Sequence, residues 1–418
     1  MKLAGEVDQQ HERSGPLQRR IEGKLLLRSA AMAEVTLRLR CLKAEVDRKN
    51  MPILSNPLDL LFQNLFFELN GLIDKGRLVL KLEGYNVTGS IKIKPALFMI
   101  ADLERRGLIE PHRSTIVESS SGNLGIALAL ICSLRGYAFI CVTDPNVSAV
   151  NRRSIEAYGG RVIVVDSRDA NGGYLETRIA CIRDLLRQNH DYVWLNQYAN
   201  EFNARAHEEW TALEILDEIP EVSHLYVGSG TTGTIMGLAR RFAELSPDTM
   251  VVAVEPEGSV TFDPSRKGRR LIPGIGTSRR PELADPELLH RIVYVPEVDA
   301  VRMCHRLARR QGLLLGGSTG SVLSAIAADA ALFDANSTIV AISPDLGEKY
   351  MDTIYSPDWV TASYGIGAAT PDDSPPRPPC DPLREIVARH SREATLVADR
   401  RREAASYRSS AKRQHTGA

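Results

Sequence analysis

The stretch Ser114–Thr143 reads "STIVESSSGNLGIALALICSLRGYAFICVT" and shows the unit from which the central part of the chain is built. It begins with a short run rich in Val and Ile, passes through a polar loop, continues as an apolar helical segment, and ends in a second β-type run. Two apolar strands joined by a helix are typical of a parallel sheet whose faces are covered by helices. The stretch therefore predicts a β-α-β unit.

The same alternation continues along most of the chain. Further β-type runs, short and rich in Val and Ile, occur at residues 77–83, 161–167, 224–230, 250–256, 291–297 and 338–345. Helical patterns separate most of these runs, at Gly122–Leu134, Asn203–Asp217, Thr232–Leu245 and Val298–Gln311. We therefore expect an α/β fold built from mostly parallel sheets with helices on both faces.

The two ends of the chain differ from this core. Residues 1–50 are rich in charge and weakly patterned, and we interpret them as an N-terminal extension. Pro371–Pro382 contains six prolines, which exclude regular secondary structure, and a charged tail follows it. We therefore expect two α/β domains, at 51–195 and 196–360, followed by a Pro-rich linker and tail at 361–418.

The composition limits the classes of partner. The chain has 418 residues, with 52 Lys and Arg against 52 Asp and Glu, and this balance argues against a nucleic-acid or anionic-membrane binder. Its longest apolar run, Leu124–Leu134, is too short to cross a bilayer. The six cysteines are scattered without a CxxC pair, which favours a reducing cytoplasm over a disulfide framework or a zinc site. We expect a cytoplasmic protein with no nucleic-acid, membrane or metal partner.

Two lysines stand where an apolar helix is predicted to begin. The segment "YNVTGSIKIKPA" (Tyr85–Ala96) places Lys92 and Lys94 directly behind a turn-forming sequence. Lys92 has two interpretations: a surface residue whose stem covers the core, or a desolvated amine held for covalent chemistry. The segment alone leaves both open.

A loop rich in glycine and threonine follows the run at 224–230. In "VGSGTTGTIMG" (Val227–Gly237), the glycines let the backbone approach a phosphate and the threonines add hydroxyl donors at a helix start. The pattern also reads GxGxxG, the dinucleotide fingerprint, with Glu255 suitably placed beyond it. However, the loop lies late in the chain, and three threonines suit a phosphomonoester better than a pyrophosphate. A glycine turn without a ligand is the third interpretation.

Two more polar loops join a predicted strand to a predicted helix. "ESSSGNLGIALA" (Glu118–Ala129) places hydroxyls, an amide and free N–H groups at a helix N-terminus, where carboxylates bind well. "LLLGGSTGSVLSA" (Leu313–Ala325) has the same character. Helix capping explains part of each loop. However, ligands of parallel α/β sheets bind at the carboxyl ends of strands, where all three loops fall. Together with Lys92, the loops favour a binding site over capping alone.

These segments resemble the fold-type II pyridoxal-phosphate enzymes of the cysteine synthase and cystathionine β-synthase family. "NVTGSIK", "SSGNLG", "GSGTTGT" and "GGSTGS" match four motifs of that family in the family's order, and "NQYANEFNARAHEEW" and "IPGIGTS" agree with two secondary ones. The resemblance covers roughly residues 50–355. It implies two domains, each a mostly parallel twisted sheet with helices on both faces, a bound pyridoxal 5'-phosphate and, in most members, a homodimer.

The resemblance also implies a role for each matching residue. Lys92 corresponds to the lysine that forms a Schiff base with the cofactor and later removes the substrate's Cα proton. Asn123 would bond the cofactor's ring oxygen, and Ser318 would face its pyridine nitrogen. The phosphate would be held by Gly230, Thr231, Thr232, Gly233 and Thr234. The carboxylate of the amino-acid substrate would be held by Ser120, Ser121 and Gln197.

Departures from the cysteine synthase pattern point to one branch of the family. "NVTGSIKIK" lacks a proline and an aspartate that sulfide-using members commonly have, and Leu124 replaces a threonine. The chain looks more like the branch that joins O-phospho-L-serine to the amine of L-glutamate through an aminoacrylate. The product of that branch, N-(2-amino-2-carboxyethyl)-L-glutamate, leads to 2,3-diaminopropionate for siderophores and peptide antibiotics. Arg279 and Arg280 are candidates to bind the glutamate, although a solvated loop explains them equally well.

Other activities stay open. Cysteine synthase activity, from O-acetylserine or O-phosphoserine and sulfide, is the first alternative, because sulfide needs no carboxylate contact. Serine or threonine dehydratase activity ranks below it, and the sequence shows no obvious haem-binding or regulatory domain of a cystathionine β-synthase. An NAD-dependent dehydrogenase would not need Lys92, and a catalytically silent subunit would be expected to lose it.

Overall fold

The computed structural model describes residues 56–62, 64–169 and 172–365, which belong to one compact unit. The predicted N-terminal extension and nearly all of the predicted linker and tail lie outside the described residues. The predicted end of the second domain, at residue 360, falls inside a helix, α11 (Pro357–Tyr364). Ser356 caps this helix, because its side chain accepts a hydrogen bond from the backbone N–H of Trp359.

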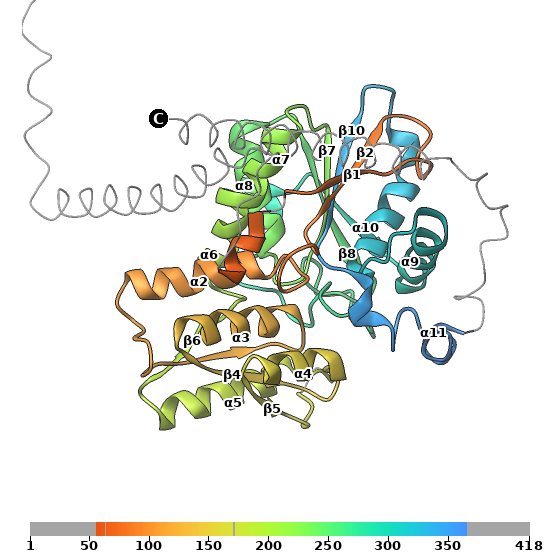
Figure 1. Cartoon of the computed structure of the whole chain (residues 1–418). Coiled ribbons are helices and arrows are strands. Elements are labelled where there is room, and N and C mark those ends of the chain that lie inside the picture. The colour runs from red at the N-terminus through yellow and green to blue at the C-terminus, as the bar shows by residue number, and fades with distance from the viewer. Residues whose placement is uncertain (1–55, 63, 170–171, 366–418) are drawn as a thin grey trace, which may run out of the picture. The chain divides into compact units, whose positions relative to one another are not determined.

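The larger of the two sheets has six strands (Figure 1). The first pair in spatial order is antiparallel, and every other pair is parallel, as the continuous apolar runs predicted. In spatial order the strands are β1 (Phe66–Glu68), β2 (Arg77–Leu82), β10 (Thr338–Ser343), β7 (His224–Gly228), β8 (Met250–Pro256) and β9 (Arg291–Val295).

The smaller sheet has four strands, all parallel. The stretch Ser114–Thr143 forms the predicted β-α-β unit within it: a strand, the helix α3 (Asn123–Arg135), and a neighbouring strand that pairs with the first from Thr115 opposite Ala138. The helix ends at Gly136, whose φ of 76° is a left-handed conformation that favours glycine. In spatial order the strands are β5 (Arg161–Val164), β4 (Ala138–Thr143), β3 (Thr115–Ser119) and β6 (Tyr192–Trp194).

Helices cover both faces of each sheet (Figure 1). On one face of the smaller sheet, α3 packs with α2 (Ile93–Arg105) and α4 (Ala149–Ala157), and the other face carries α5 (Leu175–Gln188). One face of the larger sheet carries α9 (Glu297–Gln311) and α10 (Gly317–Ala328), and the other carries α6 (Glu201–Ala206), α7 (Ala212–Glu218) and α8 (Gly233–Leu245). The short helical turns are η1 (Pro57–Phe62), the π-helical η2 (His207–Thr211), η3 (Pro286–Leu288), η4 (Ala330–Leu332) and η5 (Gly347–Tyr350).

The alternation of side chains along the strands explains why their inner positions are mostly apolar. In β10, Ile339 and Ala341 pack into the cluster under α9 and α10, whereas Val340 and Ile342 pack into the cluster under α7 and α8. Both faces of the strand are therefore buried, and its four inner positions are apolar.

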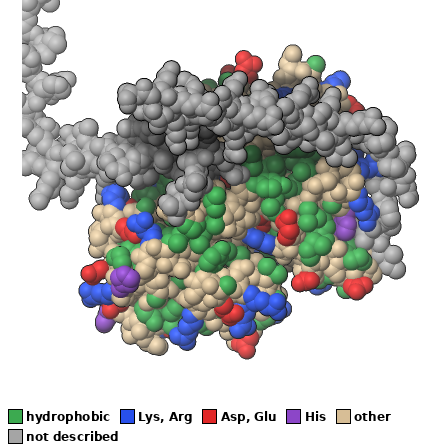
Figure 2. Space-filling model, in the orientation of Figure 1, with side chains coloured by type: hydrophobic (Ala, Val, Ile, Leu, Met, Phe, Trp, Pro, Cys, Tyr) green, Lys and Arg blue, Asp and Glu red, His purple; other side chains and the backbone are tan. Residues whose placement is uncertain are grey.

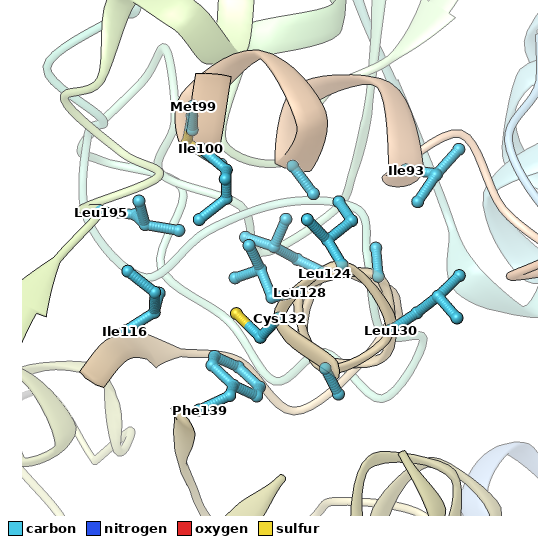
Figure 3. Close-up of a cluster of buried hydrophobic side chains, with 14 of the residues drawn as sticks. Ile93, Met99, Ile100, Ile116, Leu124, Leu128, Leu130, Cys132, Phe139 and Leu195 are labelled. Carbon is cyan, nitrogen blue, oxygen red and sulfur yellow. The ribbon is translucent and has the colours of Figure 1, made fainter. Parts of the chain in front are cut away.

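The core of the smaller sheet is built around α3. Figure 3 shows Leu124, Leu128 and Cys132 of this helix between Ile100 of α2 and Phe139 of β4. Burying side chains of this size stabilises the fold by about 1.5–3 kcal/mol each. The helix is buried on most sides, which is why its sequence is apolar without a polar stripe.

The division between the two sheets does not follow the order of the chain. β1 and β2 precede the smaller sheet in the sequence, yet β2 pairs with β10 in the larger one. The predicted boundary at residue 195 falls directly after β6, the last strand of the smaller sheet, but residues 66–82 lie in the other sheet. Local sequence predicts that a strand is buried; it does not predict which strand becomes its neighbour.

The eight β-type runs form strands, but the strand predicted directly before Gly316 is absent, since Leu315 makes only an isolated bridge to Leu346. Two strands were missed. The missed strands, β1 and β6, have three residues each, so they are too short for alternation to mark them.

Among the residues that the structure describes, no helix has the length and hydropathy that a bilayer crossing requires. On the face drawn in Figure 2, acidic and basic side chains are interspersed.

Candidate active site

Lys92 lies at the start of α2, behind a turn that Asn86 holds together. The Asn86 side chain donates to a backbone carbonyl at each end of the turn, at 2.7 and 2.8 Å, and accepts from the backbone N–H of Thr88 at 2.9 Å. Gly89 has a φ of 66°, a conformation that glycine adopts without strain. The turn thereby presents Lys92 as the N-cap residue of α2.

The Lys92 amine is in surroundings that disfavour its charge. Burial lowers the pKa of Lys92 to about 8, and the negative charge of Asp345 partly opposes this change. An amine with a pKa near neutrality is uncharged in a useful fraction of molecules, and both nucleophilic attack and proton abstraction need the uncharged form. The structure thus favours the desolvated amine over a surface lysine.

A cavity joins Lys92 to the predicted loops. Its empty space, open solvent included, is about 590 Å³. Its wall is formed by the starts of α2, α3, α8 and α10, so elements that pack on both sheets contribute to it. Eight of the predicted site residues line it: Lys92, Asn123, Gly230, Thr231, Thr232, Gly233, Thr234 and Ser318.

The loop between β7 and α8 has no room for side chains at two of its glycines. A Cβ on Gly230 would lie 2.8 Å from the carbonyl oxygen of Gly274, and one on Gly233 would lie 2.2 Å from Oδ1 of Asn203. Thr232 has a φ of 66°, a left-handed conformation that is rare for a β-branched residue. α8 begins here, so its first N–H groups and the positive end of its dipole lie at the cavity. Such a loop binds phosphate groups.

A buried histidine lies behind this loop. Nε2 of His207 lies 3.2 Å from Oγ1 of Thr234, and Nδ1 lies 3.0 Å from Oγ1 of Thr211. Burial lowers the pKa of His207 well below its usual value, and the charges of Lys92 and Lys94 lower it further. The ring is therefore neutral, with one donor and one acceptor nitrogen, and both nitrogens have a hydroxyl partner. These contacts hold the Thr234 hydroxyl at the cavity wall.

Asn123 lies beside a buried acid, Asp345, that was not among the predicted site residues. Its Nδ2 donates to Oδ2 of Asp345 at 2.7 Å, and the hydroxyl of Tyr350 donates to the same oxygen. Asp345 is 2% exposed, and its Oδ1 has no hydrogen-bond partner among the described residues. Burial raises the pKa of Asp345. The residue follows β10, so its place at the carboxyl end of a strand was the signal that could have found it.

The predicted carboxylate-binding residues lie outside the lining of this cavity. Oγ of Ser120 accepts from the backbone N–H of Gly122, the N-cap of α3, at 3.2 Å and from that of Gly125 at 3.1 Å. Nε2 of Gln197 donates to the carbonyl oxygen of Ser119 at 2.7 Å. Both side chains therefore shape the loop before α3. The four predicted site residues that do not line the cavity are Ser120, Ser121, Gln197 and Arg279.

Ser121 and Arg279 each belong to a charged group. Oγ of Ser121 donates to Asp144 at 2.9 Å and accepts from Arg178 at 2.6 Å, and Arg178 pairs with Asp144 at 3.0 Å. Arg279 pairs with Glu282 at 3.0 Å. Arg178 was missed because it lies within an ordinary helical pattern, whereas Asp144 directly follows a strand and had a positional signal.

Glu255, the acid that a dinucleotide site would need, lies away from the cavity. Glu255 lies at the end of β8, is fully buried, and does not line the cavity. Burial raises the pKa of Glu255 to about 7. A dinucleotide site needs this acid at the ribose hydroxyls, in reach of the ligand.

The chain is similar to several solved enzymes. It is 29% identical to O-ureido-L-serine synthase, with a TM-score of 0.68, over 77% of this chain and 98% of that one. A variant of that enzyme, with a lysine replaced by alanine and O-ureido-L-serine bound, is 28% identical, with a TM-score of 0.68, over 77% and 97% of the two chains. A hydrogen sulfide-producing enzyme from Fusobacterium nucleatum is 31% identical, with a TM-score of 0.67, over 71% and 100%.

A family model described as pyridoxal-phosphate dependent enzyme matches residues 64–345. This range contains every strand of the two sheets and all twelve predicted site residues. The expected α/β fold, the enzymatic nature of the protein and the expected cofactor are thereby confirmed. The chain belongs to the family of pyridoxal-phosphate dependent enzymes.

Proposed function

We propose that this protein catalyses β-replacement on an activated L-serine. The proposed substrate is O-phospho-L-serine and the proposed nucleophile is the amine of L-glutamate, which gives N-(2-amino-2-carboxyethyl)-L-glutamate. The observation that carries the proposal is the cavity in which the Lys92 amine, the start of α8 and the start of α10 face one space. The similar solved enzymes support the reaction type, because O-ureido-L-serine is an alanine with an oxygen substituent at Cβ.

The residues around the cavity fit pyridoxal phosphate. Gly230 and Gly233 let the loop pack closely against Gly274 and Asn203, and the N–H groups and hydroxyls at the N-terminus of α8 are available to a phosphate in the cavity. Asn123 offers an N–H donor for the ring oxygen, and Ser318 offers a hydroxyl for the ring nitrogen. Lys92 offers its amine for the aldehyde. Each polar group of the cofactor therefore has a partner of matching chemistry.

The residues of this chain divide the chemistry among them. The bound cofactor supplies the electron sink that acidifies the Cα proton of an amino acid. Lys92 holds the cofactor through Nζ, and when that amine is free it removes the Cα proton, since burial keeps the pKa of Lys92 at about 8. Ser318 places an uncharged hydroxyl, rather than a carboxylate, at the ring nitrogen. This choice favours loss of the β-substituent over transamination.

The start of α3 is the proposed site for the substrate carboxylate. The positive end of its dipole attracts an anion, and the N–H groups of Gly122 and Gly125 are already bonded to the Ser120 hydroxyl. Ser120, Ser121 and Gln197 surround that helix start, and their hydrogen bonds fix the loop that presents the N–H groups. The carboxylate is thereby bound close to Asn123 and the cofactor.

Arg279 is the proposed contact for a carboxylate of glutamate. It already binds carboxylates in this structure, from Glu282 at 3.0 Å and from Glu176 at 3.5 Å. Both partner side chains are about half exposed, so a substrate carboxylate can replace them at modest cost. The second candidate nucleophile is sulfide, which a similar solved enzyme handles as a product and not as a nucleophile.

With glutamate as nucleophile, the product would serve the formation of 2,3-diaminopropionate in siderophore or antibiotic biosynthesis. We also propose that the enzyme is a cytoplasmic homodimer. Light scattering of the purified protein tests the oligomeric state, since a monomer mass would contradict it.

Absorption spectroscopy of the holoenzyme separates the two nucleophiles. O-phospho-L-serine alone is expected to change the visible cofactor band, and L-glutamate is expected to restore it with formation of the amino-acid adduct, detected by mass spectrometry. Restoration by sulfide and not by glutamate would identify a cysteine synthase. Lys92→Ala is the control, and it is expected to abolish both changes while the fold is retained.

A further inference from the structure

Lys349 of η5 connects three segments of the site through one ammonium group. Its Nζ donates to Oδ1 of Asn123 at 2.7 Å, to the carbonyl oxygen of Thr88 at 2.9 Å, and to that of Gly89 at 3.3 Å. An ammonium has three N–H donors, so these bonds use all of them. The partners lie at the start of α3 and in the turn before Lys92.

These contacts determine which way the Asn123 amide faces. A lysine can only donate, so the atom that meets Lys349 must be the amide oxygen. The other end of the amide donates from Nδ2 to Oδ2 of Asp345 at 2.7 Å, and that oxygen also accepts from the hydroxyl of Tyr350. A flipped amide would set its NH₂ group against the ammonium, with two donors facing each other.

The fixed amide leaves one donor for a ligand. The NH₂ group of Asn123 has two N–H bonds, and Asp345 accepts one of them. Asn123 lines the cavity together with Asp345 and Lys92. We propose that Lys349 is a positioning residue, which fixes the Asn123 amide so that its second N–H is offered to the ring oxygen of pyridoxal phosphate. This inference rests on the proposed role of Asn123 at the cofactor.

The bonds to Thr88 and Gly89 extend this positioning to the turn that carries Lys92. A Cβ on Gly89 would lie 3.3 Å from Nζ of Lys349, so the ammonium packs closely on the turn. Lys349 thereby holds the asparagine and the turn before Lys92 at a fixed separation. The two groups that are proposed to meet the cofactor's ring oxygen and its aldehyde are aligned before the cofactor binds.

Cofactor affinity and the visible band of the bound cofactor test the inference. Lys349→Met keeps the length of the side chain and removes its donors, and it is expected to weaken pyridoxal-phosphate binding about tenfold and to shift the band. Lys349→Arg keeps the donors and is expected to restore most of the affinity. The exposed Lys75→Met is the matched control, and the melting temperature of each apoenzyme reports on folding.

A double variant separates positioning from a merely structural role. If Lys349 acts through Asn123, Lys349→Met is expected to cause little further loss of affinity in an Asn123→Ala background. Additive losses, or a lower melting temperature with an unchanged band, would overturn the inference. If Asn123→Ala alone binds the cofactor with wild-type affinity and band, the proposed role of Asn123 is wrong. If Asn123→Ala weakens binding and Lys349→Met does not, only the inference about Lys349 is wrong.

Discussion

The ammonium nitrogen of Lys94 lies 2.7 Å from Oε2 of Glu214, although 120 residues separate them in the sequence. Glu83 is equally close to Lys94, at 2.7 Å, and Lys81 lies 2.8 Å from Glu214. Two lysines and two glutamates thus neutralise one another in the protein interior. Burial opposes the charge on Lys94, yet the contacts with Glu214 and Glu83 raise its pKa above the usual value.

The two lysines at the start of α2 therefore have opposite surroundings. Lys94 keeps its charge and ties α2 to the end of β2 and to α7 through Glu83 and Glu214. Lys92 faces the cavity, where burial lowers its pKa to about 8. The buried ion pairs fix the helix start, and the helix start in turn places Lys92.

Removing the charge of Lys94 is expected to destabilise the fold. Lys94→Met leaves Glu83 and Glu214 with one lysine between them, and an uncompensated buried charge costs about 3–5 kcal/mol. Urea denaturation of the apoenzyme measures the free energy of unfolding. The exposed Lys75→Met is the control and is expected to change it by less than about 0.5 kcal/mol. A loss below about 1 kcal/mol for Lys94→Met would contradict this account of the buried group.

The rate of cofactor attachment is expected to follow the ionisation of Lys92. Only the neutral amine attacks an aldehyde, and the pKa of Lys92 is lowered to about 8. Mixing the apoenzyme with pyridoxal phosphate should therefore give a rate that rises about tenfold per pH unit below that value and levels off above it. Stopped-flow absorbance measures the rate. A rate that still rises toward pH 10, near the usual lysine pKa, would show that Lys92 is not desolvated.

A methyl group in the phosphate loop is expected to weaken cofactor binding. Gly233→Ala would place its Cβ 2.2 Å from Oδ1 of Asn203, whose side chain is buried and donates to Thr231 at 3.0 Å. The loop must shift, and about tenfold or more of the affinity for pyridoxal phosphate should be lost. Fluorescence titration measures the dissociation constant. A second substitution in the same chain, Asn203→Ala, removes the clash, so part of the affinity for pyridoxal phosphate is expected to return. An unchanged dissociation constant for Gly233→Ala alone would contradict the proposed phosphate site.

Replacing Arg279 is expected to change KM for L-glutamate and not KM for O-phospho-L-serine. Arg279→Gln removes a charge that is proposed to bind glutamate, so KM for L-glutamate should rise about tenfold while KM for O-phospho-L-serine changes little. Arg280→Gln is the matched control, because Arg280 donates to the carbonyl oxygen of Ala284 within its own loop. Initial-rate kinetics with both substrates varied give the two constants. Equal changes in both would remove the argument for Arg279 as a glutamate contact.

The sequence predicted which residues form strands better than it predicted which strands pair with one another. The eight β-type runs form strands because burial on both faces leaves a continuous apolar run, as in β10. The strand predicted before Gly316 is absent, and Leu315 makes only an isolated bridge. The pairing of β2 with β10 joins residues more than 250 positions apart, and nothing in either run specifies it. The short β6 was missed for a different reason, since three residues carry too little pattern.

The candidate site was predicted where motifs are contiguous. The loop at Gly230–Thr234 was found because glycines and hydroxyls that bind one phosphate follow one another in the chain. Asp345 and Lys349 were missed because their roles depend on contacts with Asn123, more than 200 residues earlier. His207 was missed because a lone histidine in a helical pattern gives no sign of the hydroxyl it will meet.

Reduction of the holoenzyme with borohydride, followed by peptide mapping, tests the central claim most directly. The lysines in or near the site are Lys81, Lys92, Lys94 and Lys349. Of these four, Lys92 is the one that lines the cavity, and burial lowers its pKa to about 8. We expect the pyridoxyl group on the peptide that contains Lys92, and fragmentation is expected to place it on that residue. A stable adduct on Lys81, Lys94 or Lys349, with Lys92 unmodified, would contradict the claim.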